Sequence, residues 1–384
     1  MGVGMRVFGL GFVVCALQLA CSSDTEREFS NGSGGAAGAG ATASGGAAGS
    51  ATGGTGTGAA AGAGGAGAAA SGGAGGTGGV SGSGGGGTGG TPGTGGAAPT
   101  PTVVAPAVWA QDIVEQGGTL YWTEAGTNPG YKDSKVRQWT AGGGAADLTT
   151  TPDGRFMQLA LSGSKLYWTN QGAGGGSGTV EVFDLSSSSS PQKSLATNVD
   201  MATGLARDGG KVYFTVFSTD GSVKQIDGTT VTTPFPTQSQ PNAIAAVTGK
   251  LFWGNYNQPG ALMSGTPGGS PSPLAALDYV TAVASNGTDL YVAHDGGISK
   301  LNLVGVGGVI LPDKNVTALH LTATHVYWTS AAQNLVGRAK LDGSERTELV
   351  KNAPSEPRGL TSSSTSLYWT EYGSLGRIMR LDLP

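Results

Sequence analysis

The sequence has little cysteine and little charge, and both shortages exclude classes of function. Only two of its 384 residues are Cys, at positions 15 and 21. A disulfide framework, a zinc–thiolate site and a cysteine nucleophile are therefore excluded for the rest of the chain. Charged residues make up 12%, and 21 Lys and Arg against 25 Asp and Glu give a formal net charge of −4. Such a surface binds nucleic acid poorly, so no nucleic-acid partner is expected.

Glycine is abundant but unevenly distributed. The chain has 72 Gly, of which 32 lie in residues 31–100 among Ala, Ser and Thr, and no charged residue occurs between Glu28 and Asp112. Such a segment cannot bury enough apolar surface to offset the loss of chain entropy. The glycines have no strict triplet spacing with Pro, which excludes collagen. We therefore expect a disordered tether over residues 21–100 and a globular part over 101–384.

The N-terminus has the pattern of an export signal. A short basic start ends at Arg6 and is followed by an apolar run of 14 residues, too short to span a bilayer, that ends at Ala20. Leu19-Ala20-Cys21 resembles the lipobox of bacterial lipoproteins. The resemblance implies a signal peptide over residues 1–20, a lipid on Cys21 that anchors the chain to a membrane and, because Ser22 follows, an outer-membrane location on its periplasmic or cell-surface side. The alternative is an ordinary secretory signal with an incidental Cys.

An aromatic pair recurs along residues 101–384 at intervals of about forty residues. This period is typical of four-stranded propeller blades. The position before each pair and the position eight before it are aliphatic in every copy, with turn residues such as Thr248-Gly249 between them. The seven copies are Tyr121-Trp122, Tyr167-Trp168, Tyr213-Phe214, Phe252-Trp253, Tyr291-Val292, Tyr327-Trp328 and Tyr368-Trp369.

Each unit reads as strand, tight turn and strand, followed by a third strand and a shorter fourth. No helical periodicity is sustained. The pattern predicts an all-β, seven-bladed β-propeller. The last unit ends after its third strand, so we expect residues 102–105 to close the ring as its outer strand.

The repeat resembles the YWTD repeat of the low-density-lipoprotein-receptor class. Tyr327-Trp328-Thr329, the stretch 337–344, Arg358-Gly359-Leu360 and Tyr368-Trp369-Thr370 carry the likeness best. The resemblance implies a propeller used for protein binding or interdomain packing, usually with six blades, which is the alternative count. The Asp of the fourth motif position is absent from all seven copies, so the hydrogen bonds that it makes between blades in that class must be made differently here.

The paired aromatics are expected in the blade core rather than in a sugar platform, because aliphatic residues precede them. Aromatics outside the pairs are better binding candidates, and several of them follow a pair strand directly, on loops. These candidates are Trp109, Trp139, Phe217, Tyr256, Tyr279 and Tyr372.

The position about ten residues before each pair should line the central channel. This channel column contains no carboxylate and no His, which argues against a metal-dependent propeller enzyme. We expect Gln111, Asn242 and Arg358 to form a polar channel mouth, with Arg358 a candidate ion-pair partner for Asp112. The full column is Gln111, Met157, Thr203, Asn242, Thr281, Thr317 and Arg358.

The three histidines are His294, His320 and His325. They make a weak metal signal without a third ligand, so no metal and no cofactor is expected. The sequence thus favours a lipid-anchored, non-enzymatic binding or scaffold module for a protein or glycan. The alternative is a hydrolase or lyase that acts on an envelope polymer through the channel.

Overall fold

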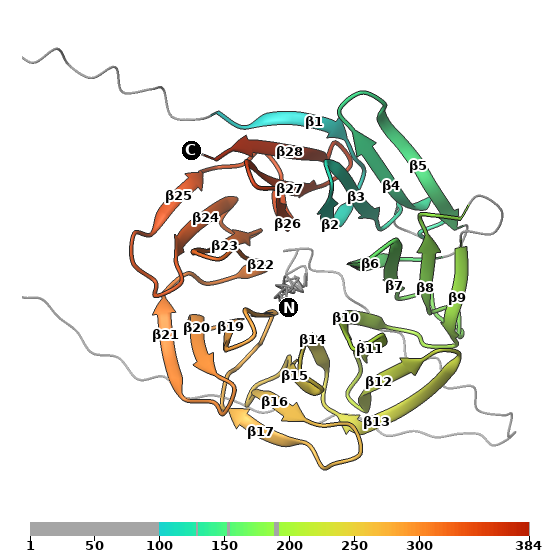
Figure 1. The fold of residues 1–384 in the computed structure, drawn as a ribbon, viewed down its shortest axis with the longest axis vertical. Helices are drawn as coiled ribbons and strands as arrows, with labels where there is room; N and C mark the ends of the chain where they lie inside the picture. Colours follow the sequence, from blue (N-terminus) through green and yellow to red (C-terminus); the bar gives the residue numbers. More distant parts are fainter. Residues whose placement is uncertain (1–99, 128–129, 152–153, 188–191, 384) are drawn as a thin grey trace, which may run out of the picture. The chain divides into compact units, whose positions relative to one another are not determined.

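The structure is a computed structural model that describes residues 100–127, 130–151, 154–187 and 192–383. The expected signal peptide, Cys21 and nearly all of the expected tether lie outside the described residues. The described residues form seven four-stranded antiparallel sheets arranged as blades around a ring, which confirms the seven-bladed propeller (Figure 1). They contain no helix that is long and apolar enough to cross a membrane.

In each blade the first strand is innermost and the chain proceeds outward. Blades 1 to 4 consist of β2 (Ala110–Gln116), β3 (Thr119–Glu124), β4 (Ser134–Thr140) and β5 (Gly144–Thr151); β6 (Phe156–Ser162), β7 (Lys165–Asn170), β8 (Thr179–Asp184) and β9 (Gln192–Thr197); β10 (Ala202–Asp208), β11 (Lys211–Val216), β12 (Gly221–Asp227) and β13 (Thr230–Gln238); and β14 (Pro241–Val247), β15 (Lys250–Asn255), β16 (Ala261–Gly265) and β17 (Ser272–Ala275).

Blades 5 to 7 follow the same order except at the closing strand. They consist of β18 (Ala282–Ser285), β19 (Asp289–His294), β20 (Gly297–Asn302) and β21 (Gly307–Leu311); β22 (Val316–Leu321), β23 (His325–Ser330), β24 (Leu335–Lys340) and β25 (Thr347–Val350); and β26 (Glu356–Ser362), β27 (Ser366–Tyr372), β28 (Arg377–Asp382) and β1 (Thr102–Pro106).

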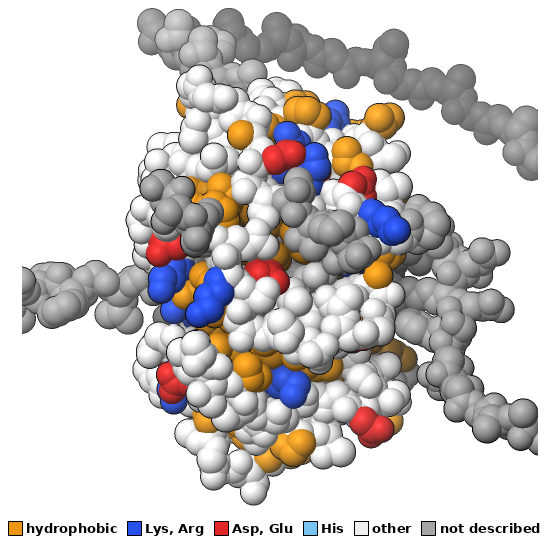
Figure 2. Space-filling view, turned by 90° about the vertical axis from the view of Figure 1, so that its right-hand side faces the viewer, with side chains coloured by type: hydrophobic (Ala, Val, Ile, Leu, Met, Phe, Trp, Pro, Cys, Tyr) orange, Lys and Arg blue, Asp and Glu red, His pale blue; other side chains and the backbone are white. Residues whose placement is uncertain are grey.

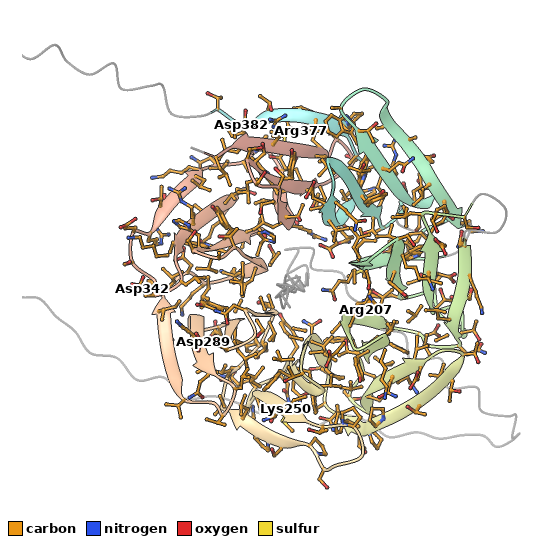
Figure 3. All side chains as sticks on the ribbon, viewed as in Figure 1. Arg207, Lys250, Asp289, Asp342, Arg377 and Asp382 are labelled. Carbon is orange, nitrogen blue, oxygen red and sulfur yellow. The ribbon has the colours of Figure 1, made fainter. Side chains whose placement is uncertain are left out.

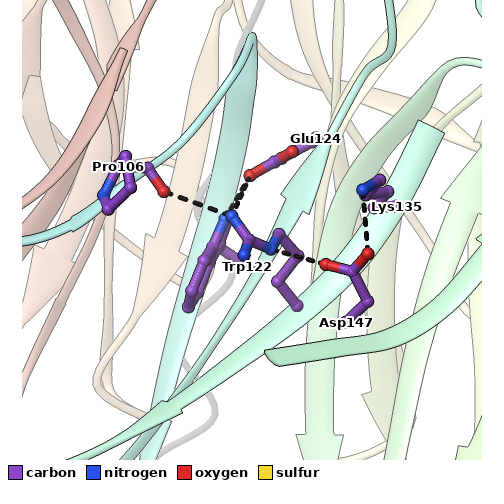
Figure 4. Close-up of polar contacts among 6 residues, drawn as sticks. Pro106, Trp122, Glu124, Lys135 and Asp147 are labelled. Carbon is purple, nitrogen blue, oxygen red and sulfur yellow. Dashed lines mark hydrogen bonds and ion pairs between the residues drawn. The ribbon is translucent and has the colours of Figure 1, made fainter. Parts of the chain in front are cut away.

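The ring closes in blade 7, where the N-terminal strand β1 pairs with the C-terminal strand β28, Thr102 opposite Arg380. Arg137 of blade 1 reinforces the junction: its Nη1 donates to the carbonyl oxygen of Pro106 at 3.2 Å and to Oε1 of Glu124 at 3.3 Å, while its Nε donates to Asp147 (Figure 4). Arg137 thereby joins the end of β1 to blade 1.

The paired aromatics fill the spaces between blades, as expected. Five Trp side chains, from Trp122 to Trp369, are fully buried. Burial of an aromatic side chain removes about 150–250 Å² from water, so these residues dominate the core. The outside of the ring carries charged side chains of both signs, interspersed with apolar ones (Figure 2). The charged residues labelled in Figure 3 come from five of the blades, with Arg377 and Asp382 both in β28 of blade 7.

The threonine that follows the aromatic pair joins each of five blades to the next. Its hydroxyl donates to the main-chain carbonyl of the next channel-column residue, over 2.5–3.2 Å. Threonine therefore makes hydrogen bonds between blades, in a repeat whose fourth position lacks Asp. The five threonines are Thr123, Thr169, Thr215, Thr329 and Thr370, and the acceptors belong to Met157, Thr203, Asn242, Arg358 and Gln111.

Blades 4 and 5 depart from this rule, since they have Gly254 and Ala293 at the threonine position. A Cβ on Gly254 would lie 2.3 Å from Cγ1 of Val280, so blade 5 packs where a threonine would stand. Blade 5 makes its link to blade 6 through its channel-column residue, because the hydroxyl of Thr281 donates to the carbonyl of Val316 at 2.7 Å.

Candidate functional site

The face that carries the connections between second and third strands, and the segments that lead into the inner strands, is called the loop face here. Two sets of side chains surround its centre. The rim residues stand three positions after each aromatic pair. They are Ala125, Gln171, Phe217, Tyr256, Asp295, Ala331 and Tyr372.

The second set, the lead-in residues, stands two positions before the channel column. Five of them adopt a left-handed conformation, a backbone state that side chains other than glycine rarely occupy. Hydrogen bonds such as that from the Tyr256 N–H to the Gln240 carbonyl, at 2.9 Å, hold this conformation beside the rim. The five are Trp109, Met201, Gln240, Tyr279 and Asn315, with φ between 48° and 63°.

Four of the predicted aromatics meet in two pairs of the same design. Tyr372 of blade 7 lies against Trp109 of blade 1, with ring centroids 4.9 Å apart. Tyr256 of blade 4 lies against Tyr279 of blade 5, with centroids 5.3 Å apart. In both pairs a rim residue contacts the lead-in residue of the next blade. Phe217 extends the second pair, with its ring centroid 6.2 Å from that of Tyr256.

Trp139 does not belong to this face. It lies in strand β4 and packs, partly buried, against a core cluster that contains Ile113 and Trp122. Its side chain therefore contributes to packing at the closing blades.

A cavity of about 220 Å³ lies on the loop face over blades 4 to 6. It exists because blades 5 and 6 place Asp295 and Ala331 where three other blades have aromatic rim residues, and because the nearby channel column has only threonines. Pockets for drug-sized ligands span roughly 300–1,000 Å³, so this cavity suits one ring or one side chain. It is lined by Tyr256, Tyr279, Thr281, His294, Asp295, Asn315, Val316, Thr317, Ala331 and Ala332.

His294 forms a rigid part of the cavity wall. Its Nδ1 accepts a hydrogen bond from the Gly296 N–H at 3.0 Å, which leaves the proton on Nε2, 2.8 Å from the hydroxyl of Ser299. Burial lowers the pKa of His294, against the opposing effect of Asp295 and Asp278. The imidazole is therefore neutral near pH 7.

The three predicted channel-mouth residues do not form one cluster. Arg358 is fully buried, and its Nη1 donates to Gln111 Oε1 at 2.8 Å. Asn242 stands in blade 4, and both of its side-chain polar atoms are buried without a hydrogen-bond partner among the described residues. Arg358 also contacts Tyr372, with its guanidinium carbon 3.3 Å from the ring centroid, so it closes the mouth beside the first aromatic pair.

The expected ion pair between Asp112 and Arg358 is wrong. Arg358 pairs with Glu356 at 2.9 Å, whereas the carboxylate of Asp112 accepts the backbone N–H groups of Ile113 and Leu159, each at 2.9 Å. The register of β2 shifts between Ala110 and Ile113, and there Asp112 turns toward Leu159 of blade 2 while Gln111 reaches Arg358 of blade 7. Burial raises the pKa of Asp112 to about 7.

His320 lies near Asp112 across a void of about 20 Å³, which has room for about one water molecule. Burial lowers the pKa of His320 to about 4, and its Nε2 lies 2.8 Å from the hydroxyl of Ser362. His325 lies on the neighbouring strand and contacts the ring of Tyr327. Within the described part of the chain, no three His, Cys, Asp or Glu side chains are grouped so that they could hold a metal ion.

Sequence reasoning missed Asp295, Asn315 and Ala331 as cavity residues. At the rim position Asp295 and Ala331 replace the aromatic side chains of other blades, but Ala125 and Gln171 do so too, so the break in the aromatic column does not by itself single out the cavity.

Comparisons with known proteins agree on the fold. The chain matches no protein-family model. It is similar to a streptogramin B lyase, with TM-score 0.56 and 17% identity over 74% of this chain and 98% of that chain. It is similar to virginiamycin B lyase from Staphylococcus aureus, with TM-score 0.58 and 14% identity over 74% and 99%. A chain of a nidogen/laminin complex matches with TM-score 0.48 and 17% identity over 60% and 95%. At these identities the two lyases share the propeller fold with this chain.

Proposed function

We propose that this propeller is a non-enzymatic binding module that takes a protein or a glycan on its loop face. The observation that carries the proposal is the cavity of about 220 Å³ bordered by Tyr256 and Tyr279. Partly exposed tyrosines beside polar groups are typical of binding surfaces, because one end of the side chain is apolar and the other forms hydrogen bonds. The repeat units resemble those of YWTD propellers, and this analogy between repeats supports the same role.

The test is capture from envelope extract together with a glycan array, using the purified full-length chain. Wild type should retain a protein or a glycan, and a Tyr256→Ala, Tyr279→Ala double variant should lose it. A Trp109→Ala variant, changed in the other aromatic pair, serves as the control. Retention of neither kind of ligand by wild type, or equal retention by the double variant, would overturn the proposal.

We further propose that the module is exported and attached to the outer membrane through a lipid on Cys21. The proposal rests on the likeness of Leu19-Ala20-Cys21 to a lipobox. An acyl chain contributes about 0.8 kcal/mol per buried methylene, so loss of the lipid should release the protein. A Cys21→Ser variant should move from the membrane fraction to the soluble fraction and should no longer incorporate labelled fatty acid. Membrane attachment that persists in the variant contradicts the anchor.

The second candidate is a channel enzyme, favoured by the buried Asp112 whose pKa is raised to about 7. Against it, the void beside Asp112 has room for about one water and not for a substrate. Turnover of an envelope polymer that is lost in Asp112→Asn or Arg358→Lys would establish this candidate instead of the binding module.

A further inference from the structure

The aromatic wall of the cavity has one ring that is held in an unusual conformation and left open to solvent. Tyr279 has φ +52° and is 37% exposed. Its ring meets that of Tyr256 at 64°, so the two rings cannot stack flat and at least one ring keeps a face that its partner does not cover. Four other lead-in residues share this left-handed conformation, so the conformation belongs to the repeat, and it is the exposure of its ring that makes Tyr279 available to a ligand.

The charge around the cavity is negative. Asp295 lines it and is exposed, and no lysine or arginine within the described ranges forms an ion pair with this carboxylate. Asp278 lies close enough to His294 to oppose, in part, the lowering of the imidazole pKa by burial. The Oδ1 of Asp278 accepts a hydrogen bond from the Gly260 N–H at 2.6 Å. Because burial keeps His294 neutral, the imidazole does not offset these two charges.

Among the described residues that line the cavity, none is Lys or Arg. The lining therefore offers ring faces, a carboxylate, hydroxyl groups and the amide of Asn315, and it lacks a positive group to receive an anion. Tyrosine rings attract a cation through their quadrupole, and an ammonium group can donate up to three hydrogen bonds to surrounding oxygens.

We infer that the cavity of blades 4 to 6 binds an alkylammonium group, held against the exposed ring of Tyr279 beside Tyr256 and paired with Asp295. This inference rests on the proposed role of the loop face as a binding surface, and it names the chemistry that the face recognises. The same group occurs on an amino sugar of a glycan and on the lysine side chain of a protein. The volume of about 220 Å³ suits such a single group at the end of a longer ligand.

The test is calorimetric titration of the full-length chain with two pairs of probes. Glucosamine against glucose represents the glycan source, and Nα-acetyl-lysine amide against its Nε-acetylated form represents the protein source. One cationic probe should bind at least about tenfold more tightly than its neutral counterpart, as cation–π and ionic contacts predict. The arm in which this difference appears identifies the source, and the affinity should fall as salt is added.

Matched variants locate the effect. Asp295→Asn and Asp220→Asn remove the same charge from exposed loop-face positions, but only Asp295 lines the cavity. Asp295→Asn and Tyr279→Ala should each weaken the cationic probe by about tenfold, whereas Asp220→Asn should leave its affinity unchanged. Equal binding of neutral and cationic probes, or wild-type affinity in Asp295→Asn, overturns the inference.

The experiments distinguish failure of this inference from failure of the proposed function. If neither cationic probe binds while the chain still captures an envelope ligand through Tyr256 and Tyr279, the alkylammonium assignment is wrong and the binding module stands. If capture fails as well, both are wrong.

Discussion

In blades 7 and 1 the loop-face aromatics pack against each other and against a buried arginine, whereas in blades 4 to 6 they border an open cavity. Both regions use the same positions: Tyr372 with Trp109 in the first, and Tyr256 with Tyr279 in the second. The channel column makes the difference, because Arg358 fills the first region and Thr281 and Thr317 leave space in the second.

The same contrast appears in the links between blades. Where the motif threonine is present, as in Thr370 of blade 7, its hydroxyl fixes the next blade. Where Ala293 replaces it in blade 5, Thr281 links that blade to blade 6, and the cavity lies over this region. The regular repeat units thus hold the ring together, and the departures from the repeat coincide with the candidate site.

The largest expected difference in the free energy of unfolding is between loss of a core aromatic side chain and loss of a surface one. Trp369→Ala removes a fully buried side chain and should lower the free energy of unfolding by about 3–5 kcal/mol. Tyr279→Ala removes a 37% exposed ring that packs against Tyr256, and it should change the free energy of unfolding by no more than about 1.5 kcal/mol. Urea unfolding of both variants checks this, and similar losses in the two would contradict the division.

Two buried groups that line the small void between the inner strands, Asp112 of blade 1 and His320 of blade 6, should have opposing effects on the pH dependence of stability. The pKa of Asp112 is raised to about 7, so its contribution to stability falls by about 4 kcal/mol as pH rises from 4 to 7. The pKa of His320 is lowered to about 4, so its contribution falls by about 3 kcal/mol as pH drops from 6.5 to 4. The two contributions to stability change in opposite directions with pH, so they nearly cancel in the wild type.

Single variants should reveal the pH dependence of stability that each group contributes. Asp112→Asn should lose stability toward pH 4, while His320→Gln should gain it there. Unfolding free energies measured from pH 4 to pH 7 test this, and a slope unchanged from wild type in both variants would show that these groups are not buried as described.

Restoring the repeat in blade 4 should harm the protein. Gly254→Thr would bring back the motif threonine, but its Cβ would meet Val280 at 2.3 Å, so we expect a loss of about 1–3 kcal/mol. A gain in stability would contradict this expectation and would mean that Gly254 is only a defect in the repeat of blade 4. Thermal unfolding distinguishes the two results.

Removal of a threonine hydroxyl that links two blades should lower the free energy of unfolding more in blade 7 than in blade 5, beside the cavity. Thr370→Val leaves the Gln111 carbonyl and the Gly359 N–H without this partner in a buried site, at a cost of about 1–3 kcal/mol. Thr281→Val should cost less than about 1 kcal/mol, because the adjoining cavity admits water. Equal losses in urea unfolding would argue against a solvated cavity.

The sequence was sufficient for the fold because the propeller is built by repetition. Each aromatic pair, such as Tyr327-Trp328, alternates with aliphatic residues in a way that sheet packing requires. The cavity could not be predicted, since it arises where Ala331 and the left-handed Asn315 of blade 6 meet the left-handed Tyr279 of blade 5. The Asp112–Arg358 pair failed because Gln111 and Asp112 face different blades at a register shift in β2, which the sequence pattern does not mark.

The most direct test compares one residue from each region in a single binding measurement. Full-length Tyr279→Ala and Trp109→Ala are assayed for retention of the envelope ligand that wild type captures, after circular dichroism has established that both are folded. We predict that Tyr279→Ala loses retention and that Trp109→Ala keeps it. Retention by Tyr279→Ala together with loss in Trp109→Ala would contradict the placement of the binding site over blades 4 to 6.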